Sequence, residues 1–499
     1  MRRLQAIVIG GAFLWTGAAH AQFGRGGGWA TSGGDAQRSF WVRSDAKISP
    51  QSMQKPGAFA VTWRVKVPGD AKTGPIAPPV LLERYIGYRG FRSLGYVSGS
   101  SDNIVAIDTD LGRVEWTKRA TSAAAACPGL TSSLTNPVSP AIAPAPAGGR
   151  GGNAFGGRGG PAKSAVGETD EGAVTIKQVS EMAARGGQGG QGGRGGRGPQ
   201  PNFPRVRSAS YVHILASDGM LHNMYVSNGE EPEAAVKFLP PGAKALGLIF
   251  VDSVAYAAAG QNCGSAPDAI YALNLESKEA ANWKPASGGI AGSTGPAIGP
   301  DGTVYVATSA GDLVALEGKT LKMKDAQRIG QPLNSSPVIF EMGEKTIIAV
   351  SSADGKIHLL DVKALGSSNA SGSAAVTGGA IASWQDPAGT RWLLGATNNG
   401  IAAWKVVEQN GSLALQPGWT KELASALNPA IVNGVVFTAT GGSAPGVLYA
   451  LDGATGKELW NSGKLITASV RGGGLSIGEN QVYIGTNDTL YAFGFPIEH

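Results

Sequence analysis

Residues Leu448–Trp460 read LYALDGATGKELW, and this stretch contains the pattern that decides the fold. It opens with a pentapeptide, Leu448–Asp452, of the form aliphatic, variable, usually Ala, large apolar and often Asp. Such alternation predicts a half-buried β-strand. The following Asp452-Gly-Ala-Thr-Gly456 predicts a tight turn, because Asp and Gly favour turn conformations. The stretch as a whole therefore predicts two neighbouring antiparallel strands that end at Trp460.

The pentapeptide recurs along the chain in eight copies. The copies are Ile104–Asp108, Leu221–Tyr225, Ile270–Asn274, Leu313–Glu317, Ile357–Asp361, Ile401–Lys405, Leu448–Asp452 and Leu490–Gly494. Their fifth positions lie 117, 49, 43, 44, 44, 47 and 42 residues apart. All the spacings except the first match the period of a four-stranded propeller blade, and the first contains an insertion.

The last copy stops at Phe495, directly after its third strand, so its blade needs a fourth strand from elsewhere. Ala60–Val67 (AVTWRVKV) has the pattern to supply it. Closing a ring with strands from both ends of the chain removes exposed sheet edges. We therefore predict an all-β fold: an eight-bladed β-propeller of four-stranded antiparallel blades over residues 60–499, closed by an N-terminal strand. Seven blades with a spare hairpin is the alternative.

The N-terminus predicts export. Arg2 and Arg3 precede the apolar stretch Leu4–Gly17, and Ala19-His20-Ala21 fits a signal-peptidase cleavage pattern. Residues 1–21 are therefore expected to be a signal peptide and residues 22–59 a leader before the propeller. A membrane anchor is the alternative, but the stretch is short for a span. We expect a periplasmic or secreted protein with no integral membrane segment after cleavage.

The two cysteines, Cys127 and Cys263, both follow apolar strands, in neighbouring blades two and three. Export would place them in an oxidising compartment, where thiols pair. We therefore expect a Cys127–Cys263 disulfide, with two plain thiols as the alternative.

Residues 144–204 form a Gly/Arg-rich insertion, expected between blades 1 and 2. The segment has too few apolar residues to build a core, which predicts disorder. Similar Arg-Gly composition can bind RNA, but an exported protein rarely meets RNA. The net charge of +6 is also small for 499 residues, so no nucleic-acid partner is expected.

Leu448–Trp460 resembles the pyrroloquinoline-quinone (PQQ) type repeat of quinoprotein dehydrogenases, and the similarity extends over roughly residues 60–494. The leader segment Trp29–Arg38 also resembles the segment before the first blade in this superfamily. The same repeat occurs in non-enzymatic propellers, including an outer-membrane assembly scaffold. The resemblance implies structural roles for Asp452, which would cap its turn, and for Trp460, which would stack between blades. It does not settle the function.

For the enzymes of this superfamily the resemblance implies PQQ and calcium as cofactors, but the chain departs from their pattern. They have a pair of adjacent cysteines over the cofactor, whereas Cys127 and Cys263 are far apart. A Cys-x-x-Cys-His haem motif is missing, and the Glu, Asn and Asp that hold calcium and act as the base have no clear match. The histidines His213, His222, His358 and His499 show no ligand spacing, so no metal site is predicted.

Segments expected to face the axis provide the candidate ligand-binding residues, which are Ser293, Asn334, Asn428 and Arg471, with Asn136 and Ser469 at similar positions. Arg471 could hold a carboxylate in a bidentate pair, or it could form a structural salt bridge or face solvent. The Asn side chains could ligate a hard cation, or they could satisfy backbone groups at strand ends.

Two functions remain open. The first is an exported binding or scaffold propeller that takes a protein partner or a small anionic ligand, including a quinone, in the axial channel. The alternative is a PQQ-dependent dehydrogenase that oxidises alcohols or sugars and passes electrons to a separate acceptor. The departures from the enzyme pattern favour the first.

Overall fold

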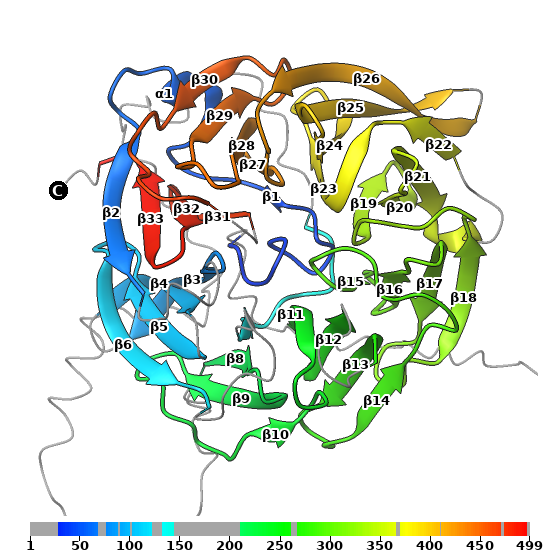
Figure 1. The fold of residues 1–499 in the computed structure, drawn as a ribbon, viewed down its shortest axis with the longest axis horizontal. Helices are drawn as coiled ribbons and strands as arrows, with labels where there is room; N and C mark the ends of the chain where they lie inside the picture. The colour runs from blue at the N-terminus through cyan, green and yellow to red at the C-terminus, as the bar shows by residue number, and fades with distance from the viewer. Residues whose placement is uncertain are drawn as a thin grey trace, which may run out of the picture. The chain divides into compact units, whose positions relative to one another are not determined.

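The computed structural model describes residues 28–67, 76–87, 90–99, 102–121, 132–143, 210–260, 267–365, 370–409, 411–470 and 474–496. In these ranges the strands form eight sheets around a common axis (Figure 1). Each sheet is a blade of four antiparallel strands, and one blade carries an additional short strand near the axis. The chain is an all-β, eight-bladed propeller, so the main prediction is confirmed and the seven-blade alternative is wrong.

The blades follow one another along the chain. In each blade the strands are given from the axis outward. Blade 1 consists of β3 (Val80–Gly87), β4 (Gly90–Ser98), β5 (Asn103–Asp108) and β6 (Arg113–Arg119), and blade 2 of β7 (Ser133–Thr135), β8 (Tyr211–Leu215), β9 (Met220–Tyr225) and β10 (Val236–Lys237). Blade 3 consists of β11 (Lys244–Val251), β12 (Val254–Gly260), β13 (Ala269–Asn274) and β14 (Ala280–Trp283), and blade 4 of β15 (Ala297–Ile298), β16 (Val304–Ala307), β17 (Asp312–Leu316) and β18 (Met323–Arg328). Blade 5 consists of β19 (Val338–Met342), β20 (Lys345–Ser351), β21 (Lys356–Asp361) and β22 (Ala370–Ser373), and blade 6 of β23 (Val376–Gln385), β24 (Arg391–Thr397), β25 (Gly400–Gln409) and β26 (Ser412–Glu422). Blade 7 consists of β27 (Ala430–Val432), β28 (Val435–Ala439), β29 (Leu448–Asp452) and β30 (Glu458–Asn461), and blade 8 of β31 (Leu475–Gly478), β32 (Gln481–Gly485), β33 (Thr489–Gly494) and β2 (Ala60–Lys66). Every pentapeptide lies in the third strand of its blade, except that Glu317, the last residue of the fourth copy, directly follows β17.

The ring closes where β2 pairs antiparallel with β33. Trp63 lies opposite Ala492, Val65 opposite Leu490 and Lys66 opposite Thr489, with a bulge between Val61 and Trp63. The outermost strand of blade 8 thus comes from the N-terminal part of the chain, which confirms the predicted closure.

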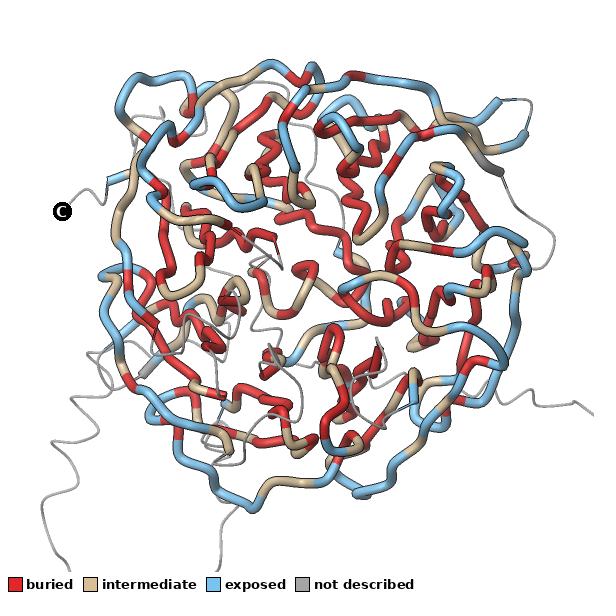
Figure 2. The backbone as a smooth tube through the Cα atoms, viewed as in Figure 1, coloured by how far each residue is buried: buried red, intermediate tan, exposed pale blue. Residues whose placement is uncertain are grey.

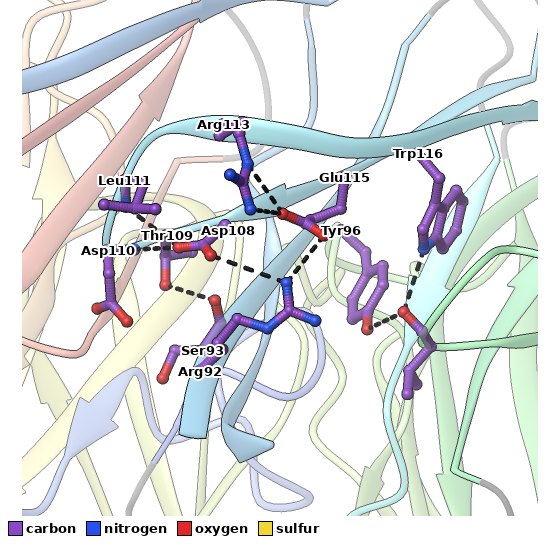
Figure 3. Close-up of polar contacts among 11 residues, drawn as sticks. Arg92, Ser93, Tyr96, Asp108, Thr109, Asp110, Leu111, Arg113, Glu115 and Trp116 are labelled. Atoms are coloured by element: carbon purple, nitrogen blue, oxygen red, sulfur yellow. Dashed lines mark hydrogen bonds and ion pairs between the residues drawn. The ribbon is translucent and has the colours of Figure 1, made fainter. Parts of the chain in front are cut away.

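Tryptophans on the outer strands join neighbouring blades. In each of three cases the indole N–H donates a hydrogen bond to a backbone carbonyl of the next blade. The bonds run from Trp63 to Thr109 (2.8 Å), from Trp116 to Val226 (3.1 Å) and from Trp419 to Gly453 (2.9 Å). Figure 3 shows Trp116 and the Tyr96 hydroxyl directed to one carbonyl group, that of Val226. These rings therefore hold adjacent blades together as well as filling space between them.

A glycine in the partner blade makes this contact possible. Gly112 has a φ of +61°, and a Cβ atom there would lie 2.4 Å from the Trp63 ring. The left-handed conformation and the close approach both require a residue without a side chain. Gly229 and Gly456 take the same role against Trp116 and Trp419.

The two residues assigned structural roles from the repeat behave as expected. Asp452 Oδ1 accepts hydrogen bonds from the backbone N–H groups of Ala454 and Thr455. The Trp460 ring of blade 7 meets the Phe493 ring of blade 8 edge to face, with centroids 5.7 Å apart. Both side chains are explained by the fold and carry no chemistry.

Buried side chains are concentrated on the inner and middle strands, while the outer strands are largely exposed (Figure 2). The aliphatic residues of facing blades pack into continuous clusters, the largest of which joins the leader with blades 1, 6, 7 and 8. The ring is thus stabilised by contacts between blades as much as within them.

Several predictions concern residues outside the described ranges: the signal peptide 1–21, Cys127, Cys263, Arg471, His499 and the insertion 144–204. The insertion was expected between blades 1 and 2. In the structure β7 precedes it and β8 follows it, and these strands pair with each other, so the segment connects two strands of blade 2. No helix in the described ranges is long and apolar enough to cross a bilayer.

Candidate functional site

The leader, described from residue 28 onward, winds through the centre of the ring, where Figure 1 shows its trace together with β1 (Trp41–Val42). Its backbone carbonyls accept hydrogen bonds from backbone N–H groups of six blades in chain order. The pairs are Trp29 with Leu81, Ala30 with Asn136, Ala36 with Ile298, Gln37 with Ile339, Ser39 with Ser383 and Phe40 with Ile431, at 2.7–3.0 Å. Thr31 also joins the leader to blade 3, because its hydroxyl donates a hydrogen bond to the Leu248 carbonyl. The leader therefore touches blades 1 to 7 before the chain reaches β2 of blade 8.

After β1 the chain leaves the axis through a short helix, α1 (Pro50–Met53), whose N-cap is Ser49. Asn433 of blade 7 donates to the carbonyls of Asp45 and Ile48, which fixes this exit. The closing strand is thus delivered to blade 8 by a segment that is itself anchored to the blades.

Arg38 anchors the leader and is almost completely buried. Its guanidinium donates to the carbonyls of Pro296 (2.9 Å) and Gly247 (2.6 Å), to the Thr31 hydroxyl (3.1 Å) and to the Ser32 carbonyl. Burial lowers the pKa of Arg38 to about 9, against a smaller opposing effect of the Asp35 carboxylate. Because all its nitrogens have acceptors, Arg38 is a structural link between blades 3 and 4.

The predicted residues Asn334 and Asn428 lie at the start of the innermost strands, one on either side of Gly378–Gly379 of blade 6. Asn334 Oδ1 accepts a hydrogen bond from Ser351 Oγ at 2.6 Å. A Cβ atom on Gly379 would lie 3.4 Å from the Asn428 amide. Ser293 is exposed on blade 4. The structure thus brings the two amides near each other, while Arg471 lies outside the described residues.

The other polar residues singled out from the sequence have local partners. Asn136 Nδ2 donates to the Leu81 carbonyl, linking blades 1 and 2, while its Oδ1 is buried without a hydrogen-bond partner in the described ranges. His213 stacks on Phe250 and bonds Asn223, and burial lowers its pKa to about 4. His222 contacts Glu231, and His358 contacts Ser352. Among the described residues no cluster of three or more His, Cys, Asp or Glu side chains is arranged to hold a metal ion.

A quinone with calcium, as the PQQ resemblance implies, would need space and charged partners on the axis. At the level of the leader that space holds Arg38 and the leader backbone, whose polar groups are already bonded to the blades. At the level of Asn334 and Asn428 the described candidates are neutral amides. Neither of these two places, within the described part of the chain, offers this cofactor both space and charged partners.

A different site opens between the innermost strands of blades 5 and 6 and the end of the leader. It is a cavity of about 260 Å³ whose polar wall includes Arg43, Arg391, Ser383 and Gln385. Its apolar wall includes Trp41, Ile339 and Phe340. Both guanidiniums lie beside one indole ring, with Cζ of Arg43 at 3.8 Å and Cζ of Arg391 at 5.7 Å from the Trp41 ring centroid. Two cations thus converge on one small cavity.

The donors of this cavity are incompletely paired. Arg391 is 8% exposed and donates from Nη2 to the Glu341 carbonyl (2.8 Å) and to Gln385 Oε1 (3.3 Å). Its Nε, the Nε and Nη1 of Arg43, and the Ser383 hydroxyl are all buried without a hydrogen-bond partner among the described residues. Burial lowers the pKa of Arg391 to about 10, and repulsion from Arg43 contributes in the same direction. Buried donors of this kind are normally satisfied, so the arrangement suits an acceptor that is not part of the blades.

Sequence reasoning missed this pair for a clear reason. The resemblance in the leader ended at Arg38, and Arg43 follows it by a few residues. Arg391 begins β24, where it reads as an ordinary strand-end residue. The one sequence signal for Arg391 is that a charged residue stands directly before the apolar run Trp392–Leu394.

A second perturbed group, Glu83, lies at the seam between blades 1 and 8. A Cβ atom on Gly28 would lie 2.9 Å from its carboxyl carbon, and one on Gly478 would lie 2.7 Å from its Oε1. Burial, together with smaller contributions from the carboxylates of Glu479 and Asp45, raises the pKa of Glu83 from 4.5 to about 7, against the opposing effect of Arg84. The folded protein therefore binds more protons than the unfolded chain between about pH 4.5 and pH 7.

Glu83→Gln should remove this pH dependence. The stability linked to Glu83 is present below pH 4.5 and is lost as the pH rises through 7, so an uncharged side chain should raise the free energy of unfolding at pH 8 by about 2 kcal/mol. Little change is expected at pH 4.5. Urea unfolding at both pH values measures the difference, with the exposed Glu422→Gln as a control. An equal change at both pH values would contradict the expectation.

The comparisons with known proteins agree with this architecture. Residues 268–462 match a sequence family described as outer membrane protein assembly factor BamB. No curated protein matches the chain. The quinohemoprotein alcohol dehydrogenase from Comamonas testosteroni superposes with a TM-score of 0.56 at 13% identity, covering 95% of this chain and 82% of that one.

Two further solved structures share the fold. A europium-containing methanol dehydrogenase superposes with a TM-score of 0.58 at 10% identity, covering 94% and 98% of the two chains. The computationally designed Ika8 protein superposes with a TM-score of 0.50 at 12% identity, covering 86% and 98%. At these identities the likeness concerns the fold alone, and it includes both natural dehydrogenases and a designed protein.

Proposed function

We propose that this chain, a β-propeller of PQQ-type repeats, is an exported binding or scaffold protein that catalyses no reaction by itself. One observation carries the proposal: the leader lies on the axis and is bonded to blades 1 to 7. Because the leader occupies the centre of the propeller, ligands or partners would bind in cavities beside the leader or on the outer faces of the blades.

The partner is a protein or a small anionic ligand. The match of residues 268–462 to the family described as an outer membrane protein assembly factor supports a role in protein contacts. Residues 1–21, read as a signal peptide, support a periplasmic or secreted location. The Cys127–Cys263 disulfide and a carboxylate contact from Arg471 belong to the same proposal.

The alternative, a PQQ-dependent dehydrogenase, is tested directly by adding PQQ and calcium to the purified protein. Dye reduction is then assayed over a panel of alcohols and sugars. We expect no turnover above the rate with PQQ and calcium alone, because the leader holds the axis. Turnover that depends on calcium and is lost in Arg471→Ala would overturn the proposal and establish the dehydrogenase.

A further inference from the structure

We propose that the cavity between blades 5 and 6 binds a small organic carboxylate, held by Arg43 and Arg391. This inference rests on the proposed binding function and deepens it by naming a site and the chemical class of its ligand. The site consists of the two guanidiniums, the Ser383 hydroxyl, and the apolar side chains of Trp41 and Phe340.

The first reason is hydrogen bonding. Nε of Arg391, Nε and Nη1 of Arg43 and the Ser383 hydroxyl are buried without partners within the described part of the chain. An unsatisfied buried donor costs about 1–3 kcal/mol, and more when it is charged. A carboxylate has two oxygens with about four acceptor positions, and the planar guanidinium matches it in a bidentate pair. A bound carboxylate would therefore satisfy donors that the blades leave unpaired.

The second reason is charge. Two guanidiniums share the cavity, and the facing carboxylates are those of Asp35 and Glu341. Asp35 Oδ2 lies 3.7 Å from Arg43 Nη2, and both its oxygens already accept hydrogen bonds from Ser39. Glu341 lines the cavity and is exposed; its backbone carbonyl accepts a hydrogen bond from Arg391, and its carboxylate attracts both guanidiniums. Asp35 balances part of the charge of Arg43, and solvent screens the exposed Glu341 carboxylate. The cavity therefore keeps a partial positive charge, which suits a monoanion better than a dianion.

The third reason is size and polarity. A cavity of about 260 Å³ lies near the lower end of ligand pockets, which limits the ligand to a few carbon atoms or one ring. Trp41, Ile339 and Phe340 supply an apolar wall beside the cations. This combination favours a carboxylate with an apolar body over an inorganic oxyanion, because an inorganic oxyanion has no apolar part to pack against this wall.

The test uses the purified protein and four sodium salts at constant ionic strength: acetate, benzoate, sulfate and inorganic phosphate. Isothermal titration calorimetry and the shift in melting temperature measure binding. Benzoate is expected to bind with a Kd of about 0.1–1 mM, and acetate more weakly because it covers less of the apolar wall. Sulfate and phosphate are expected to bind at least tenfold more weakly than benzoate.

Variants assign the binding to this cavity. Arg391→Met should weaken benzoate binding at least tenfold, and Arg391→Lys should weaken it several-fold because the ammonium lacks the planar fork. Ser383→Ala should weaken it about threefold through the loss of one donor. Arg328→Met is the matched control, since Arg328 is an exposed residue on β18 that pairs with Asp312, and its Kd should stay that of the wild type.

Three results would overturn the site: no benzoate binding up to about 50 mM, wild-type affinity in Arg391→Met, or binding of sulfate or phosphate in preference to both carboxylates. Melting curves of each variant without ligand separate lost binding from lost folding. Failure of this titration leaves the proposed binding function standing, because a protein partner does not require the cavity. Turnover with PQQ and calcium would overturn that function without touching the carboxylate result.

Discussion

Replacing Val65 by proline is expected to lower the free energy of unfolding by about 3 kcal/mol or more. Val67 N–H donates to the Asp488 carbonyl at 2.8 Å, and hydrogen-bonded pairs alternate along an antiparallel ladder. The N–H of Val65, which lies opposite Leu490, therefore faces β33 as the next donor. Proline removes this donor in the strand that closes the ring, and Val65 is a buried member of the core. Urea denaturation of the purified variant measures the loss.

Arg64→Pro is the matched control. Arg64 is exposed on the same edge strand, and by the same alternation its N–H points away from β33. Proline is tolerated on edge strands where the N–H faces solvent, so Arg64→Pro should cost much less than Val65→Pro. Equal losses would mean that the register of closure does not control the stability of the ring.

Arg38→Met is expected to destabilise the protein by about 3–5 kcal/mol. The substitution keeps much of the side-chain volume but removes every hydrogen bond of the guanidinium. The carbonyls of Gly247 and Pro296, on two different blades, lose their charged donor inside the ring. Arg38 also has a φ of +59°, a strained conformation that persists only while its surroundings hold it. Thermal and urea unfolding should both show the loss.

Arg391→Met provides the contrast for this prediction. Arg391 is also buried, but its Nε has no partner in the described ranges. Arg391→Met loses the hydrogen bonds to the Glu341 carbonyl and Gln385, but it also removes a buried charge that Arg43 repels. These effects oppose each other, so a change of less than about 1 kcal/mol is expected, in either direction. If Arg391→Met destabilised the protein as strongly as Arg38→Met, the guanidinium of Arg391 would be a structural link and not a ligand-binding group.

The repeat could be predicted because its information is local. Each pentapeptide carries the alternation of a third strand, and turn residues such as Asp452 and Gly456 separate it from the fourth. Closure by Ala60–Val67 could also be inferred, because the last blade lacks an outer strand and this segment is a strand pattern that belongs to no other blade. The binding residues were harder, since Ser293, Asn334 and Asn428 were chosen for being near the axis and the leader was not expected to lie there.

The sequence by itself determined the number of blades, the position of every third strand and the strand that closes the ring, because periodic burial and turn chemistry act over a few residues. Only the tertiary structure decided what lies on the axis and which cations meet. The leader is held by bonds such as that between Arg38 and Pro296, which are 258 residues apart. Arg43 and Arg391 likewise meet over one indole ring from distant parts of the chain. No local pattern encodes such encounters, because they depend on the path of an irregular segment through a ring that other residues build.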